Sequence, residues 1–235
     1  MVSKTTKNIS AQEFHKLGEK LREEDRLQDA VDALTSAIVK YTIDKNYKGL
    51  IDALRSRSLT WKHLFLVHNK RDYLKLATLD ARASLLIAKR KNIKGELSKC
   101  YFGMGEIYLL KKNYKKAVFY YKKSLLFYKG PLAEKGRHKY HLGEALYRLG
   151  RKKWGKEEMK KGLEEIEKGK GGVDSFVFNV WKSGCLMRLA ELLLKDDSEK
   201  AKEFLKLAGG IVKNDKRLVI RKRQLQELKD QFKAQ

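Results

Sequence analysis

The chain has little of what many folds require, with one proline and two cysteines among 235 residues. Proline usually makes up about 5% of a sequence and interrupts helices, so its scarcity favours helices with short connections over a strand-rich fold. Two cysteines are too few for a disulfide-built fold. Both Cys100 and Cys185 lie in helical patterns, where we expect each thiol to be buried as a small apolar group.

Long apolar runs and catalytic motifs are also missing. No stretch approaches the roughly 18 apolar residues of a membrane span, and the start of the chain lacks the apolar stretch of a signal peptide. The sequence therefore predicts a cytoplasmic protein that does not enter a membrane. Nucleophile elbows, phosphate-binding glycine loops, paired metal-binding cysteines and dinucleotide fingerprints do not occur. We expect no enzymatic activity, no cofactor and no metal site.

Charge, by contrast, is abundant and one-sided. The 54 Lys and Arg residues outnumber the 29 Asp and Glu residues and give a formal net charge of +25. Such a balance predicts attraction to acidic surfaces, whether nucleic acid, anionic lipid or acidic protein. Hydrophobic residues still make up 42% of the chain, which is enough to build a core beneath this surface.

A pattern of large and small residues recurs along the chain. In its clearest copy, large residues line one face of a first helix and small residues allow a second helix to approach closely. The members of this copy are Tyr101, Met104, Gly105, Tyr108, Tyr114, Ala117, Tyr121 and Ser124. Gly18, Gly143 and Ala190 occupy the small position in three further copies, whereas Phe65 occupies it in another, whose hairpin should be splayed or shifted.

This pattern resembles the tetratricopeptide repeat (TPR), in a form with a longer period of about 40 residues. The resemblance implies an all-α, right-handed superhelical solenoid of about five antiparallel helix pairs with a C-terminal capping helix. The expected parts are an extended or disordered segment at 1–9, repeats at 10–45, 48–91, 94–129, 131–168 and 174–212, and a basic capping helix at 213–235. Local sequence agrees: Ser10 and Glu13 form a capping box, Pro131 opens a helix and Gly150 follows one.

In such repeats the first helix of each pair lines the groove, and the residue after each small position should face it. Four of the five residues at that position are glutamates, namely Glu19, Glu106, Glu144 and Glu191, and the fifth is Leu66. A free row of glutamates would favour a cationic guest. Alternatively, these glutamates make ordinary intrahelical pairs with a base four residues on, as Glu144 could with Arg148 and Glu191 with Lys195.

We therefore predict a non-enzymatic protein-interaction module, an adaptor or scaffold that binds a peptide segment of a partner in its groove. The residues expected to contact this segment are Glu19, Lys62, His63, Glu106, Tyr140, His141, Glu144, Arg148, Arg188 and Glu191. The sequence does not define an oligomeric state. Self-association through an apolar patch on the first or last hairpin is a further alternative.

The rival hypothesis is nonspecific nucleic-acid binding by the basic surface. Lysine pairs recur at positions 111–112, 115–116 and 122–123, and the densest basic cluster lies near the C-terminal end. That cluster comprises Lys213, Lys216, Arg217, Arg221, Lys222 and Arg223. No recognition-helix, RNA-binding or zinc-finger motif is present, so such binding should be salt-sensitive and weakly selective. The terminal helix carries too little apolar surface for membrane docking.

Overall fold

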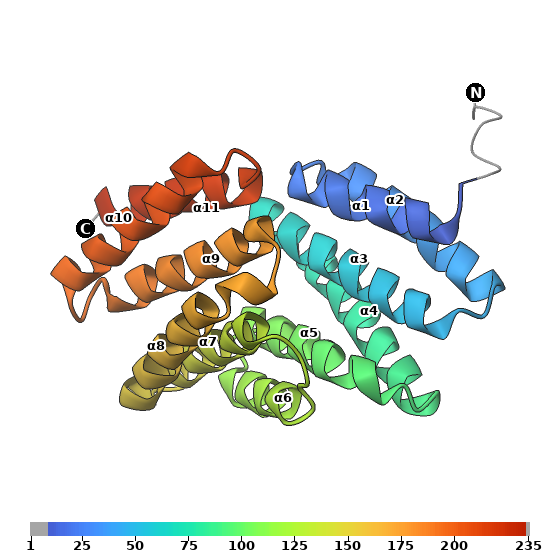
Figure 1. Ribbon diagram of the computed structural model, residues 1–235, viewed down its shortest axis with the longest axis horizontal. Coiled ribbons are helices and arrows are strands. Elements are labelled where there is room, and N and C mark those ends of the chain that lie inside the picture. The colour runs from blue at the N-terminus through green and yellow to red at the C-terminus, as the bar shows by residue number, and fades with distance from the viewer. Residues whose placement is uncertain (1–8, 234–235) are drawn as a thin grey trace. The chain divides into compact units, whose positions relative to one another are not determined.

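A computed structural model describes residues 9–233, which form α-helices and short 3-10 turns and contain no β-strand (Figure 1). The all-helical prediction is therefore confirmed. Apart from Ile9, the predicted N-terminal segment lies outside the described residues. The chain divides into two compact units, with the boundary between Ile107 and Tyr108, inside one helix.

The first unit consists of two antiparallel hairpins and most of a following helix. Its helices are α1 (Ala11–Glu23), α2 (Leu27–Ile43), α3 (Tyr47–His68), α4 (Arg71–Arg90) and α5 (Leu97–Leu110), with a 3-10 turn, η2 (Lys94–Glu96), before α5. In the α3–α4 hairpin, the buried Ser58 hydroxyl of α3 donates to the carbonyl oxygen of Ala77 of α4 at 2.8 Å. That Phe65 splays or shifts this hairpin stays a prediction.

The second unit contains the end of α5 and six further helices. These are α6 (Tyr114–Leu126), α7 (Leu132–Arg148), α8 (Lys152–Lys168), α9 (Ser175–Leu193), α10 (Ser198–Asn214) and α11 (Val219–Lys233), with a 3-10 turn, η3 (Lys170–Gly172), before α9. The last helix begins at Val219 rather than at residue 213, because α10 continues to Asn214 and a turn follows it. Leu225 and Leu228 of α11 are buried against α9 and α10.

Helix ends follow the short-range signals in the sequence. Ser10 Oγ accepts from the Glu13 amide at 3.2 Å, and the Glu13 carboxylate accepts from the Ser10 amide at 2.7 Å, which completes the predicted capping box. Pro131 directly precedes α7. Gly150 follows α7 with φ +90°, a conformation that residues with a side chain rarely adopt.

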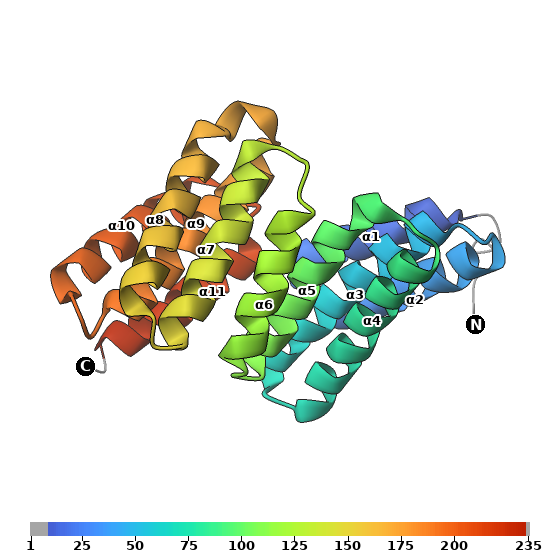
Figure 2. The same cartoon turned by 90° about the horizontal axis from the view of Figure 1, so that it is seen from below.

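Helices α7 and α8 lie side by side along the hairpin (Figure 2), and glycines line their contact. A Cβ placed on Gly162 would lie 2.7 Å from the carbonyl oxygen of Gly136 and 2.7 Å from the amide nitrogen of Tyr140. A Cβ on Gly143 would lie 2.7 Å from the carbonyl oxygen of Gly155. These separations are shorter than normal van der Waals contact, so the two helices approach closely only because these positions are glycine.

Both cysteines are buried, as expected from their helical settings. Burial raises the pKa of Cys100 to about 11 and also raises the pKa of Cys185 well above its usual value. Because the thiolate is the reactive form, a raised pKa suppresses reaction at neutral pH.

We predict that both thiols of the folded chain react with a disulfide reagent at pH ~8 at least about 100-fold more slowly than free cysteine. Denaturant should restore ordinary reactivity. The absorbance of the released thiol measures both rates, and rapid stoichiometric labelling of the native chain would contradict the burial.

Candidate functional site

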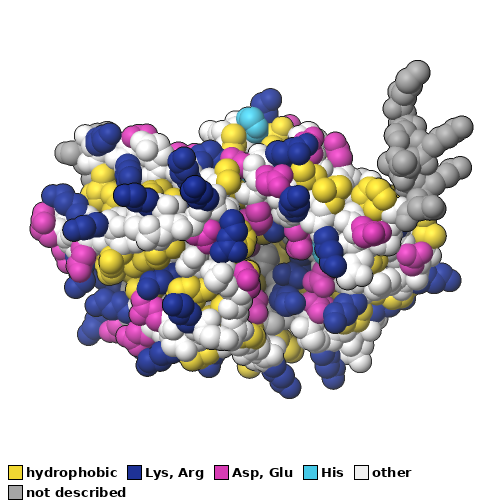
Figure 3. Space-filling view, turned by 45° about the horizontal axis from the view of Figure 1, so that its top comes forward, with side chains coloured by type: hydrophobic (Ala, Val, Ile, Leu, Met, Phe, Trp, Pro, Cys, Tyr) yellow, Lys and Arg dark blue, Asp and Glu magenta, His cyan; other side chains and the backbone are white. Residues whose placement is uncertain are grey.

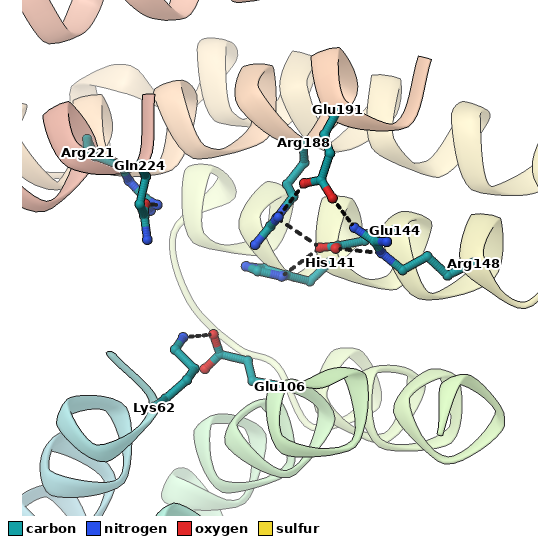
Figure 4. A network of polar contacts seen from close by, with 9 residues as sticks. All are labelled: Lys62, Glu106, His141, Glu144, Arg148, Arg188, Glu191, Arg221 and Gln224. Atoms are coloured by element: carbon teal, nitrogen blue, oxygen red, sulfur yellow. Dashed lines mark hydrogen bonds and ion pairs between the residues drawn. The ribbon is translucent and has the colours of Figure 1, made fainter. Parts of the chain in front are cut away.

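The predicted groove residues in the first unit lie on α1, α3 and α5. Lys62 of α3 and Glu106 of α5 form an ion pair at 2.5 Å, and their side chains are only 15% and 18% exposed (Figure 4). His63 lies beside Lys62 and is half-buried. Glu19 of α1 accepts from the Ser56 hydroxyl at 2.9 Å and keeps a side chain that is 48% exposed. Glu19 is thus the most open of the predicted glutamates.

The groove residues in the second unit form a network between α7 and α9 (Figure 4). Arg148 donates from Nε to Glu144 at 3.0 Å and from Nη2 to Glu191 at 2.7 Å. Arg188 donates from Nη1 to Glu191 at 2.5 Å, and its Nε lies 3.4 Å from Glu144. Each carboxylate therefore interacts with both guanidinium groups. We call these four residues the α7–α9 cluster.

Burial differs sharply within the α7–α9 cluster. The Glu144 side chain is 2% exposed, whereas Arg148 and Arg188 are 27% and 38% exposed. The Glu144 charge raises the pKa of Arg188 despite its partial burial. Burial alone would raise the pKa of Glu191, but Arg188 and Arg148 outweigh it and hold that pKa below the ordinary glutamate value. Arg188 and Glu191 of the cluster are therefore both charged at neutral pH.

Tyr140 and His141 are also less accessible than the sequence register implied. Tyr140 is 3% exposed and lies in the core with Met159 and Cys185, so its ring is not available to a partner. The prediction that Tyr140 faces the groove is wrong because its Cβ packs over Gly162, where α7 and α8 approach closely. His141 stacks on the Tyr140 ring at a centroid distance of 4.2 Å and on Tyr121 at 5.7 Å.

The glutamates do not form a free acidic row. Glu144 pairs with Arg148 four residues on, as one interpretation of the sequence expected. Glu191 pairs with Arg148 and Arg188 rather than with Lys195. Glu106 pairs with Lys62, which is 44 residues away in the sequence. Because bases within the chain balance these carboxylates, the attraction expected for a cationic guest is reduced.

The basic residues near the C-terminal end are distributed over three segments. Lys213 belongs to α10, Lys216 and Arg217 to the following turn, and the other three to α11. All three arginines interact within the chain: Arg217 with Asp215 at 2.8 Å, Arg221 with Gln224 at 2.7 Å and Arg223 with Glu227 at 3.3 Å. Of the six residues in this predicted basic cluster, the three lysines are exposed and take no part in these interactions, namely Lys213, Lys216 and Lys222.

Elsewhere, Lys and Arg side chains are spread over the surface and are interspersed with Asp and Glu, as the face in Figure 3 shows. Within residues 9–233, no group of His, Cys, Asp and Glu is arranged to hold a metal ion. His138 is fully buried, and its Nδ1 lies 2.8 Å from the Ser124 hydroxyl. No helix in the described part of the chain is long and apolar enough to cross a bilayer.

Antiparallel helix hairpins that meet at small residues are features of the TPR-like fold. No family model and no curated protein sequence matches the chain. Solved structures do match it. A Podosopora anserina protein of nearly identical kinesin-light-chain TPR-like repeats is 11% identical, with a TM-score of 0.52 over 87% of this chain and 96% of that one.

A second solved structure shows the same relationship. BtubC (BKLC) from P. vanneervenii is 13% identical, with a TM-score of 0.50 over 86% of each chain. At such low identity these similarities establish the TPR-like fold alone. The predicted handedness and the five-pair count of the array stay predictions.

Proposed function

We propose that the chain is a non-enzymatic protein-interaction scaffold and that the α7–α9 cluster binds a segment of a partner protein. The observation that carries this proposal is the buried Glu144 carboxylate, which fixes two partly exposed arginines on neighbouring helices. Guanidinium groups held in place lose less side-chain entropy when they bind a ligand than mobile ones do. Rigid arginine is also among the residues most often important for binding at protein interfaces.

The guanidinium nitrogens that do not bond to Glu144 or Glu191 indicate the chemistry of the bound segment. Nη1 of Arg148 and Nη2 of Arg188 form no hydrogen bond with the two carboxylates. Guanidinium nitrogens only donate, so the matching groups are carbonyl and carboxylate oxygens. An extended peptide segment supplies such oxygens from its backbone and from acidic side chains. The paired glutamates thus favour an acceptor-rich segment over the cationic one that a free acidic row would attract.

The first unit offers a smaller surface of the same kind, which we include in the proposal. Its predicted groove residues belong to α1, α3 and α5, and they are Glu19, Lys62, His63 and Glu106. The Lys62–Glu106 pair is largely buried, so Glu19 is the residue most able to contact a partner there.

Peptides selected from a random display library against the full chain would test this function. We expect the double variant Arg148→Ala with Arg188→Ala to bind the selected peptides at least about tenfold more weakly, because two fixed, partly exposed guanidinium groups that donate hydrogen bonds are lost. Affinities are measured by fluorescence anisotropy, and circular dichroism verifies that the variant is folded.

Arg223→Ala is the matched control, because Arg223 is also an arginine paired with a glutamate, but on α11. It should change the affinity by less than about twofold. Failure to select any peptide, or equal binding by the folded double variant and the control, would refute the proposal.

A further inference from the structure

Helix α6 and its flanks carry a basic surface that the α7–α9 cluster does not include. Between Glu106 and Glu134 the chain has seven lysines and no acidic residue. The two acidic residues that border this stretch are engaged elsewhere, Glu106 with Lys62 at 2.5 Å and Glu134 with Arg137 at 3.2 Å. The positive charge of the stretch is therefore not balanced by its nearest carboxylates in the sequence.

One face of α6 combines this charge with exposed apolar side chains. Phe119 is 53% exposed and Leu126 is 72% exposed. Lys115 and Lys122 alternate with them at spacings of three and four residues, which places all four side chains on one helical face. We call these four residues the α6 face. The opposite side of the helix is buried through Ala117, Val118, Tyr121 and Ser124.

Further lysines border the α6 face. Lys123 lies over the Phe119 ring at 5.8 Å, and Lys116 lies over Tyr108 at 5.3 Å. Within residues 9–233, neither Lys115 nor Lys122 forms an ion pair with a carboxylate. The α6 face thus presents apolar anchors and ammonium groups whose charges no carboxylate of the described chain neutralises.

We propose that the α6 face binds an acidic amphipathic helix of a partner protein. Phe119 and Leu126 are seven residues apart, so they lie two helical turns from each other, about 10 Å along the axis. Apolar residues at i and i+7 of a partner helix match this separation. Glutamate or aspartate side chains between those residues would pair with Lys115 and Lys122. This docking surface is distinct from the α7–α9 cluster and extends beyond the function proposed for it.

Two other anionic partners fit the α6 face less well. A nucleic acid would pair its phosphates with the lysines and stack a base on Phe119, but it would leave Leu126 without an apolar contact. An interfacial membrane helix needs an apolar stripe with its lysines on the polar side. Here the lysines lie on the same line as Phe119 and Leu126, so inserting the apolar side chains into lipid would also bury ammonium groups.

The test uses the full chain and a synthetic helical peptide of about 20 residues, which carries leucines seven apart and glutamates between them. We expect saturable binding in isothermal titration calorimetry. Phe119→Ala with Leu126→Ala should weaken it at least about tenfold, and Lys115→Glu with Lys122→Glu should do the same. A matched control on α10, Leu207→Ala with Lys206→Glu, changes a leucine that is 52% exposed and should leave the affinity within about twofold.

Three outcomes would overturn the proposal. The first is no binding of the acidic peptide, and the second is equal weakening by the α10 control variant. The third is that a single-stranded oligonucleotide, or vesicles that contain phosphatidylserine, bind more tightly than the acidic peptide does and are weakened equally by the α6 variants. Circular dichroism and the urea midpoint of each variant verify that loss of binding does not reflect loss of the fold.

Discussion

Glu144→Ala is expected to lower the free energy of unfolding by about 3 kcal/mol, because it removes the buried member of an ion-pair network. The Glu144 side chain is 2% exposed and interacts with both arginines of the α7–α9 cluster. Without it, Arg148 and Arg188 would repel each other with only Glu191 to offset their charges. Urea titration followed by far-UV circular dichroism measures the loss as a lower midpoint.

A solvent-exposed glutamate provides the control for this change. Glu199 is 87% exposed and pairs with Lys202 at 2.9 Å. Exposed pairs contribute little, so Glu199→Ala should alter the free energy of unfolding by less than about 0.5 kcal/mol. Equal effects of Glu144→Ala and Glu199→Ala would show that the network does not stabilise the second unit.

Features set by neighbours in the sequence were the most predictable. The capping box of Ser10 and Glu13 requires only residues three apart, and the end of α7 was indicated by the glycine at position 150. Such rules predicted the helical repeats with little need for long-range information.

The pairing of charges was less predictable because it depends on which helices become neighbours. The expectation that helical charges pair with a partner four residues on predicted the Glu144–Arg148 contact correctly, but it assigned Lys195 to Glu191. In the structure, Arg148 reaches Glu191 across 43 residues of sequence. Arg188, three residues before Glu191 on α9, is a local partner that the four-residue spacing overlooks, whereas the contact with Arg148 of α7 depends on the packing of the two helices.

Tyr140 is buried where α7 and α8 approach each other closely at Gly162. Gly162→Ala is expected to lower the free energy of unfolding by about 2 kcal/mol, because it inserts a methyl group between closely packed backbones. The new Cβ would lie 2.7 Å from both the Gly136 carbonyl oxygen and the Tyr140 amide nitrogen. Rigid backbone atoms cannot rotate away as a side chain would, so α7 and α8 must separate. The urea midpoint of the second unit reports the cost.

The matched substitution Gly210→Ala separates this steric effect from helix propensity. Gly210 also lies within a helix of the second unit, and a Cβ there would meet no atom within 4 Å. Alanine is the better helix former by about 1 kcal/mol, so Gly210→Ala should raise the urea midpoint while Gly162→Ala lowers it. Opposite signs for the same chemical change would identify the close approach of α7 and α8, which also buries Tyr140, as the cause. A stabilising Gly162→Ala would instead mean that the two helices are not in tight contact.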